Sequence, residues 1–290
     1  MALIYNASFD SQTRTLSLLD KAGNVISSCE VPSKEPLVDD PNKPLMLRAI
    51  ADNSSVTLRK SGTLSNTYQT STDGTNWTDY TLETQIRLNK GESVYFRCSN
   101  HPTTQTLYSY VYFYMAGKIE AWHNAYSMIS SDFSSTEGSV GDYGMNGLFE
   151  RCGSLTKAPL LLNTLSPYCY VGMFIQCESL TQAPVLPKTI LAKGCYQYMF
   201  AYCKSLTKAA PLPATTLAEE CYDGMLHDCS NLKEVRISAT TTAPNALNNW
   251  LNNVSATGDF YCDPNAKIFP TGASGCPSGW TRRNIADYPN

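Results

Sequence analysis

The feature that most constrains this chain is an internal repeat in its second half. One set of cysteines recurs at intervals of 25, 26 and 26 residues, and columns of further cysteines, phenylalanines and leucines keep the same register. The columns are Cys152, Cys177, Cys203 and Cys229; Cys169, Cys195 and Cys221; Phe149, Phe174, Phe200 and Leu226; and Leu155, Leu180, Leu206 and Leu232. A fixed period of this length is typical of stacked units, each of which buries its apolar side chains against its neighbours.

Each unit is predicted to contain one short helix and one short strand. Apolar residues spaced by four form a helical stripe, as with Leu191, Cys195, Met199 and Cys203. Gly172 and Gly224 lie inside the equivalent stretches, so these helices are expected to be short and irregular. The following pattern S-L-T-x-A-P-x-L-P indicates a short strand and a tight corner, because proline is confined to strand ends and edges. Residues 145–283 are therefore predicted to form an α/β solenoid with a strand face and a helix face.

The units resemble the Treponema-type leucine-rich repeats of the BspA-like family of bacterial surface proteins. The family pattern A-F-x-x-C-x-x-L corresponds here to M-F-x-x-C-x-S-L, and the C-Y-x-x-M-F variant is similar to that in proteins of gut Bacteroidetes and their phages. The stretch ATGDFYCDPNA…SGCPSGWTRRN resembles the closing segment of such arrays. The resemblance covers about residues 145–283 and implies a leucine-rich-repeat-like solenoid with a C-terminal cap. The family includes adhesins, ligand binders and virion appendages, so the resemblance implies the fold more sharply than the function.

The cysteines have three possible roles. The chain has 11 of them, which would suit a disulfide scaffold. Their regular spacing instead favours small buried side chains that fill a narrow core, with a disulfide ladder as the alternative. A metal site is not expected, because no C-x-x-C is present and the chain has only 3 histidines. Cys262 and Cys276 lie outside the columns and are the expected pair if any disulfide forms.

The first half is predicted to be β-structure. Residues 1–35 read as a three-stranded β-meander suited to attachment or oligomerisation, followed by a linker in which Asp39 and Asp40 are expected to be solvated. Residues 45–122 contain short strand patterns separated by turn signals such as Asp-Gly and Lys-Gly, which predicts a β-sandwich. Residues 123–144, rich in Ser and Gly, are expected to connect it to the repeats. The whole is thus predicted to be multidomain, mainly β and then α/β.

Two groups of aromatic residues stand out in this half. Trp77 is expected to be a core anchor or a packed edge residue, with sugar stacking as the alternative. Tyrosines alternate with other residues, which places them on one strand face; they are Tyr108, Tyr110, Tyr112 and Tyr114. Packing in a core or an interface and an exposed binding platform are both open interpretations of this face.

Several function classes find no support in the sequence. The net charge is -3, 16% of the residues are charged, and no basic block exists to neutralise phosphates, so nucleic-acid binding is not expected. No apolar run approaches the roughly 20 residues that span a bilayer, and the N-terminus does not read as a signal peptide. G-x-S-x-G, Walker A and H-E-x-x-H motifs are missing. We therefore expect no membrane partner, no catalytic residue, no cofactor and no metal, with His227 a surface residue of a repeat.

The predicted binding surface is the strand face of the repeats. Alternation turns Leu155 inward and Thr156 outward. The matching outward positions and their neighbours are Thr156, Lys157, Thr181, Gln182, Thr207, Lys208, Lys233 and Glu234. This stripe is the candidate surface for binding a glycan or a protein, and a merely solvated face is the default interpretation.

These observations lead to a functional hypothesis of a non-enzymatic structural or binding protein. The leading expectation is a phage virion appendage, a head or tail fibre that docks by its N-terminus and displays the repeats for host-surface recognition. Its partners would be other virion proteins, copies of itself in a dimer or trimer, and a host surface glycan or protein. Assembly in the reducing host cytoplasm would suit unpaired thiols. The alternative is a bacterial cell-surface adhesin or glycan-binding protein, and the third hypothesis is an accessory module of a carbohydrate-active enzyme.

Overall fold

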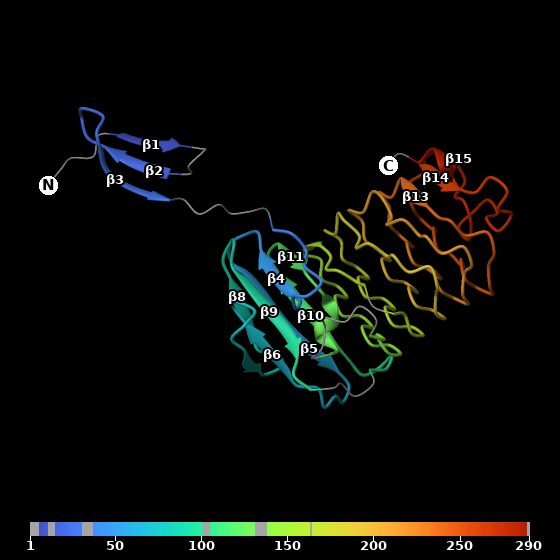
Figure 1. Cartoon of the computed structure of the whole chain (residues 1–290). Helices are drawn as coiled ribbons and strands as arrows, with labels where there is room; N and C mark the ends of the chain where they lie inside the picture. Colours follow the sequence, from blue (N-terminus) through green and yellow to red (C-terminus); the bar gives the residue numbers. More distant parts are fainter. Residues whose placement is uncertain are drawn as a thin grey trace. The chain divides into compact units, whose positions relative to one another are not determined.

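The computed structural model describes residues 6–10, 15–30, 37–100, 105–130, 138–162 and 164–288. The chain forms two compact units, Met1–Val38 and Asp39–Asn290 (Figure 1). The first unit is an antiparallel sheet in the order β1 (Asn6–Asp10), β2 (Thr15–Leu19) and β3 (Val25–Glu30). Asp20 shapes the turn after β2, because its carboxylate accepts hydrogen bonds from the backbone N–H groups of Ala22 and Asn24, both at 2.8 Å. The rest of the expected meander lies outside the described residues.

The second unit begins with two sheets that face each other. The strands are β4 (Met46–Ala49), β5 (Ser54–Ser61), β6 (Tyr68–Ser71), β7 (Thr78–Tyr80), β8 (Ile86–Leu88), β9 (Ser93–Cys98), β10 (Tyr110–Ala116), β11 (Ile119–Trp122) and β12 (Leu155–Lys157). One sheet has the order β10-β5-β8 and the other β12-β11-β4-β9-β6-β7. Phe113 of β10 and Phe96 of β9 meet between them in an edge-to-face contact at 5.0 Å, so the apolar core of this part lies between the sheets.

The repeats continue directly from these sheets. The strand β12 belongs to the first repeat and pairs in parallel with β11. The last repeats end in a parallel sheet of β13 (Glu234–Arg236), β14 (Asp259–Cys262) and β15 (Thr281–Asn284). Figure 1 shows the segments between them as successive turns of chain stacked beside one another.

The prediction of an α/β leucine-rich-repeat-like solenoid is wrong. The described residues contain no α-helix, only the short 3-10 helices η1 (Ala125–Met128) and η2 (Ile285–Asp287), and their several sheets do not close into a solenoid. The segments expected to be helices are runs of β-turns in which every fourth residue has a positive φ. These residues are Tyr143, Gly147 and Arg151; Tyr168, Gly172 and Gln176; Gly194, Tyr198 and Tyr202; Glu220, Gly224 and Asp228; and Asn245, Asn249 and Asn253.

The backbone hydrogen bonds explain why these segments are not helices. Within one segment the N–H of Ile175 donates to the carbonyl of Gly172 at 3.0 Å, which closes a β-turn. The intervening N–H groups donate to the next repeat, as from Gly172 to Gln197 at 2.9 Å and from Phe174 to Met199 at 2.9 Å. An α-helix would direct all these groups along its own axis and leave none for a neighbour. The turns share the helix's spacing of four between inward residues, and that shared period made the sequence pattern misleading.

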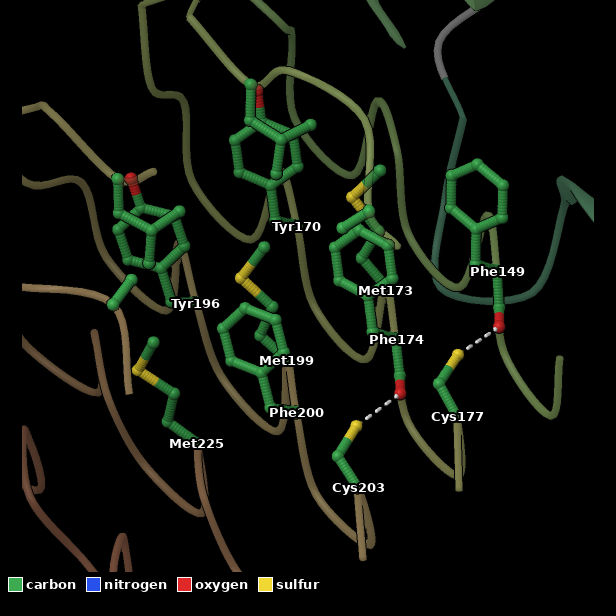
Figure 2. Packing of buried hydrophobic residues seen from close by; sticks show 14 of the residues in the cluster. Phe149, Tyr170, Met173, Phe174, Cys177, Tyr196, Met199, Phe200, Cys203 and Met225 are labelled. Atoms are coloured by element: carbon green, nitrogen blue, oxygen red, sulfur yellow. Dashed lines mark hydrogen bonds between the residues drawn. The ribbon is translucent and has the colours of Figure 1, made fainter. Parts of the chain in front are cut away.

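Two stacks of aromatic rings fill the core of the repeats. The phenylalanine stack runs through Phe113, Phe149, Phe174 and Phe200, with ring centroids 5.3, 5.4 and 5.6 Å apart. A second stack joins Tyr170, Tyr196, Tyr222 and Trp250, with centroids 5.9, 6.0 and 6.3 Å apart. Figure 2 shows the rings of successive repeats lying over one another.

The cysteine columns pack beside these rings as free thiols. Cys177 Sγ donates a hydrogen bond to the carbonyl of Phe149 at 3.1 Å, and Cys203 Sγ donates to the carbonyl of Phe174 at 3.2 Å (Figure 2). Cys229 repeats this contact with Phe200 one repeat earlier, and Cys152, in the first repeat, makes it with Phe113 of β10. The thiol thus combines an apolar body with a donor that reaches the neighbouring repeat. Every cysteine whose side chain is described, including Cys262 and Cys276, is free and buried.

Candidate functional site

The predicted strand stripe lies along the repeats in register. Thr181 N–H donates to the carbonyl of Thr156 at 3.3 Å, and Lys233 N–H donates to the carbonyl of Thr207 at 2.9 Å. The flanking positions pair through parallel bridges, Lys157 with Gln182 and Lys208 with Glu234. The structure therefore arranges the stripe in two parallel columns that run from repeat to repeat, one of the outward residues and one of their neighbours.

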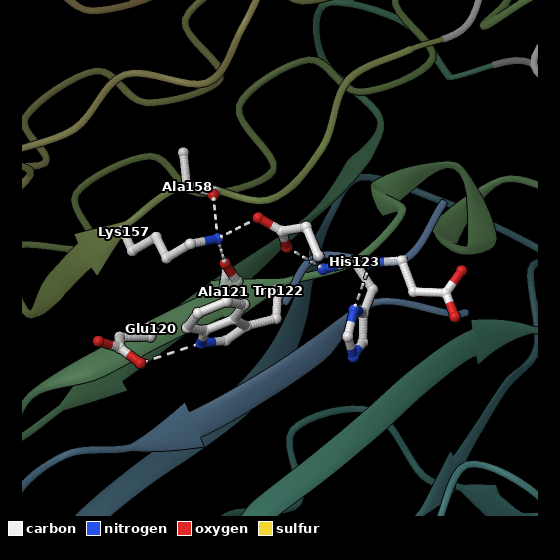
Figure 3. A network of polar contacts seen from close by, with 8 residues as sticks. Glu120, Ala121, Trp122, His123, Lys157 and Ala158 are labelled. Atoms are coloured by element: carbon white, nitrogen blue, oxygen red, sulfur yellow. Dashed lines mark hydrogen bonds and ion pairs between the residues drawn. The ribbon is translucent and has the colours of Figure 1, made fainter. Parts of the chain in front are cut away.

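Lys157 is used inside the protein rather than offered to a ligand. Its Nζ lies 2.7 Å from Asp39 Oδ2, donates to the carbonyl of Ala121 at 3.2 Å, and sits 3.9 Å from the centroid of the Trp122 ring (Figure 3). Only 19% of its side chain is exposed. Asp39 also accepts a hydrogen bond from the backbone N–H of His123 at 2.8 Å. The expectation that Asp39 is solvated is therefore wrong: it fixes the start of the second unit to β11 and β12.

Much of the remaining stripe is also occupied by contacts between repeats. The Thr156 hydroxyl donates to the carbonyl of Ile119 at 3.1 Å, and the Thr181 hydroxyl donates to the carbonyl of Thr156 at 3.2 Å. Lys208 is exposed and its Nζ lies 3.2 Å from a carboxylate oxygen of Glu234, whose side chain is largely covered. Gln182, Thr207 and Lys233 are exposed and make no such side-chain contact with the described residues. The stripe is thus a polar surface on which few side chains are left to bind a ligand.

A second surface is formed by tyrosines on β10. Val111, Phe113 and Met115 point into the core, and the alternating tyrosines point outward. Tyr110 and Tyr112 are half-buried with ring centroids 5.9 Å apart, and Tyr114 is 50% exposed. The structure thus favours the exposed interpretation of the tyrosine pattern over core packing. Tyr108, which was expected on the same strand face, precedes β10 and is 79% exposed.

Neighbouring charges hold these rings in place. The Arg59 guanidinium lies 4.3 Å from the centroid of the Tyr114 ring and 3.3 Å from Glu83. The Tyr110 hydroxyl lies 3.2 Å from a carboxylate oxygen of Glu150, to which it donates. Burial and the Glu150 charge raise the pKa of Tyr110 to about 12, so the phenol stays protonated. The rings are therefore oriented before any ligand arrives.

The tyrosines continue onto the turn segments. The Tyr143 and Tyr168 rings stack at 5.1 Å with an angle of 7° between their planes, and the Tyr168 hydroxyl donates to Glu220 at 2.7 Å. Tyr198 is 39% exposed, and Tyr202 packs edge-on against His227 at 5.5 Å. We define the tyrosine surface as Tyr110, Tyr112, Tyr114, Tyr143, Tyr168, Tyr198 and Tyr202. Sequence reasoning missed its second part, because Tyr168, Tyr198 and Tyr202 were expected in helices and Tyr143 in the connection to the repeats.

Glycines leave the space in which these rings lie. A Cβ atom at Gly194 would be 2.3 Å from the Tyr168 ring, and one at Gly224 would be 2.1 Å from the Tyr198 ring. Each ring therefore lies across the next repeat instead of projecting away from the surface. Tyrosine and glycine at outward positions of adjacent turns were the signal in the sequence that could have revealed this surface.

Other candidate chemistry is sparse in the described part of the chain. No group of three or more His, Cys, Asp or Glu residues there could hold a metal ion, and no helix there is long and apolar enough to cross a membrane. His227 pairs with Asp228 at 2.7 Å, and His101 lies outside the described residues. Trp77, next to the edge strand β7, is half-buried beneath the Arg97 guanidinium at 4.2 Å.

Comparisons of the chain with protein-family models, with curated proteins and with solved structures find no match. The resemblance to the BspA-like family therefore depends on its motifs alone.

Proposed function

We propose that this protein is a non-enzymatic binding protein that recognises carbohydrate through the tyrosine surface. The observation that carries the proposal is the set of outward tyrosine rings on β10 and the stacked turns, which neighbouring side chains hold in place. Tyrosine offers a large, rigid contact area with little loss of side-chain entropy on binding. It also combines an apolar ring face with a hydroxyl that bonds at the edge.

The groups around the rings favour a sugar over other ligands. A pyranose presents an apolar face that stacks on an aromatic ring and hydroxyls that need acceptors. Glu150 and Glu220 place carboxylate oxygens beside Tyr110 and Tyr168.

The proposed setting is a virion appendage that recognises the surface of its bacterial host. The chain is divided into a small antiparallel unit, Met1–Val38, and a larger unit that carries the tyrosine surface. This division supports a docking role for the small unit and a display role for the larger one. Unpaired buried thiols suit assembly in a reducing cytoplasm. A bacterial cell-surface adhesin that uses the same surface is the alternative setting.

A glycan array that carries bacterial surface polysaccharides tests the proposal. Tyr114→Ala and Tyr198→Ala remove exposed rings and should each weaken binding about three- to tenfold, in line with roughly 0.5–1.5 kcal/mol for an aromatic contact. Thr207→Ala on the strand stripe is the matched control and should bind normally. Loss of binding in the control alone, or binding only to protein ligands, would contradict the proposal. Immunogold labelling of purified particles and of bacterial cells separates the two settings.

A further inference from the structure

A groove of about 750 Å³ opens between the two facing sheets, away from the tyrosine surface. Its walls come from β6, β7, β8 and the start of β9. The lining residues are Thr70, Ser71, Thr72, Asn76, Thr78, Ile86, Arg87, Leu88, Glu92, Ser93 and Val94. This volume lies within the range of roughly 300–1,000 Å³ that is usual for small-molecule sites.

The groove has an apolar floor and a hydroxylated wall. Leu88 and Val94 are buried beneath it, and Ile86 is half-buried. The side-chain hydroxyls of Thr70 and Ser93 have no hydrogen-bond partner among the described residues, so both can bond a ligand. A ligand with one apolar face and several hydroxyl groups matches this lining.

The charged groups of the groove define the ligand further. Arg87 on β8 is exposed and has no ion pair or hydrogen bond within the described residues, whereas Arg97 and Arg283 donate to Gln69 and Asp259. Its planar guanidinium can donate two parallel hydrogen bonds to a carboxylate.

The one lining carboxylate leaves room for a sugar hydroxyl. Glu92 accepts the backbone N–H of Asn89 at 2.7 Å through Oε2, and Oε1 remains available to accept from a ligand. We propose that this groove is a second binding site, which takes a sugar bearing a carboxylate, with Arg87 as the anion-recognising residue. The site is independent of the tyrosine surface, so the two proposals can fail separately.

Isothermal titration and amide chemical-shift mapping of the full chain test the site, with glucuronic acid and N-acetylneuraminic acid as probes. Glucose supplies the ring without the charge, and acetate supplies the charge without the ring. We expect the acidic sugars to shift amides of β6, β8 and β9, and to bind at least tenfold more tightly than either control. Binding should weaken as salt rises, because charge attraction is screened.

Substitutions separate the role of Arg87 from general charge. Arg87→Gln should weaken binding of the acidic sugars by ten- to a hundredfold, which corresponds to a charge-assisted hydrogen bond. Arg87→Lys should recover part of the affinity, and Lys90→Gln, which removes a nearby charge outside the groove, should leave it unchanged. Equal affinity for glucose, unchanged binding by Arg87→Gln, shifts confined to other strands or no binding by any probe would each overturn the proposal.

Discussion

Replacing glycine by alanine at Gly194 should destabilise the protein, although the same change inside an α-helix would stabilise it by about 1 kcal/mol. Gly194 has a φ of +58°, and Gly172 in the preceding repeat has a φ of +56°. Alanine is strained in this left-handed region, at a cost of about 1–2 kcal/mol. The sign of the effect therefore distinguishes stacked turns from helices.

The two glycines also differ in surroundings, which allows the size of the effect to be worked out. At Gly172 an added Cβ meets nothing closer than Ile175 Cγ2 at 3.6 Å, so only the backbone strain of about 1–2 kcal/mol is expected. At Gly194 the Cβ would lie 2.3 Å from the Tyr168 ring. Tyr168 must then move and give up its hydrogen bond to Glu220 and its stack on Tyr143, which adds about 1–3 kcal/mol. The total for Gly194→Ala is about 2–5 kcal/mol.

Equilibrium unfolding in urea, followed by tryptophan fluorescence, measures both changes. Repeating Gly194→Ala in a Tyr168→Ala background should reduce its cost to that of Gly172→Ala, since the clash is then removed. If both alanine variants were more stable than the parent, the turns would be helices. An equal cost at the two sites would refute the role of Tyr168.

Three further outcomes follow from other contacts. Burial lowers the pKa of His123, so the unfolded chain takes up the proton first and stability should fall as the pH drops below about 6.5. His123 has a φ of +66°, and its Nδ1 accepts the backbone N–H of Asp40 at 3.1 Å. His123→Asn keeps an acceptor and tolerates the positive φ, and should flatten this dependence in urea titrations between pH 5 and 8. Lys157→Met should cost about 1–3 kcal/mol by leaving Asp39 unpaired, and adding Asp39→Asn should recover part of that loss. Burial raises the pKa of the column thiols, so Ellman's reagent should label them slowly in the native protein. After unfolding without reductant, the reagent should label the thiols nearly completely. If few thiols reacted after unfolding, the cysteines would instead be paired in disulfides.

The sequence predicted the core of the repeats better than their backbone. The columns of Cys, Phe and Leu are all buried as expected, because burial follows from period and polarity. The helix prediction failed because a spacing of four fits both a helix and a run of β-turns. Only residues that tolerate a positive φ distinguish them, and the glycines and the asparagines at 245, 249 and 253 fall at that spacing. Gly172 and Gly224 gave the correct signal but were interpreted as irregularities of a helix, and the asparagines were not used as a signal.

The binding stripe could be predicted only in part, because some of its contacts join residues that are far apart in the sequence. Alternation placed Thr156 outward on the strand face with Lys157 beside it, and the structure leaves both side chains half-buried. It could not show that Lys157 meets Asp39, which is 118 residues away in the chain. Contacts of that range depend on the register between the repeats and the sheets, which a pattern within one repeat does not contain.

The phenylalanine stack links stability to the tyrosine surface. Phe113 belongs to β10 and lies 5.3 Å from Phe149 of the first turn segment, so the repeats are built onto the sheets without a break in the core. A repeat cannot bury its own apolar side chains, and so its outward tyrosines are rigid only while the rings beneath them are stacked. Tyr112 and Tyr114 flank Phe113 on the same strand, and Tyr198 lies two residues before Phe200. A cavity in this stack, as from Phe174→Ala, should therefore weaken ligand binding at the surface although Phe174 itself is fully buried and touches no ligand.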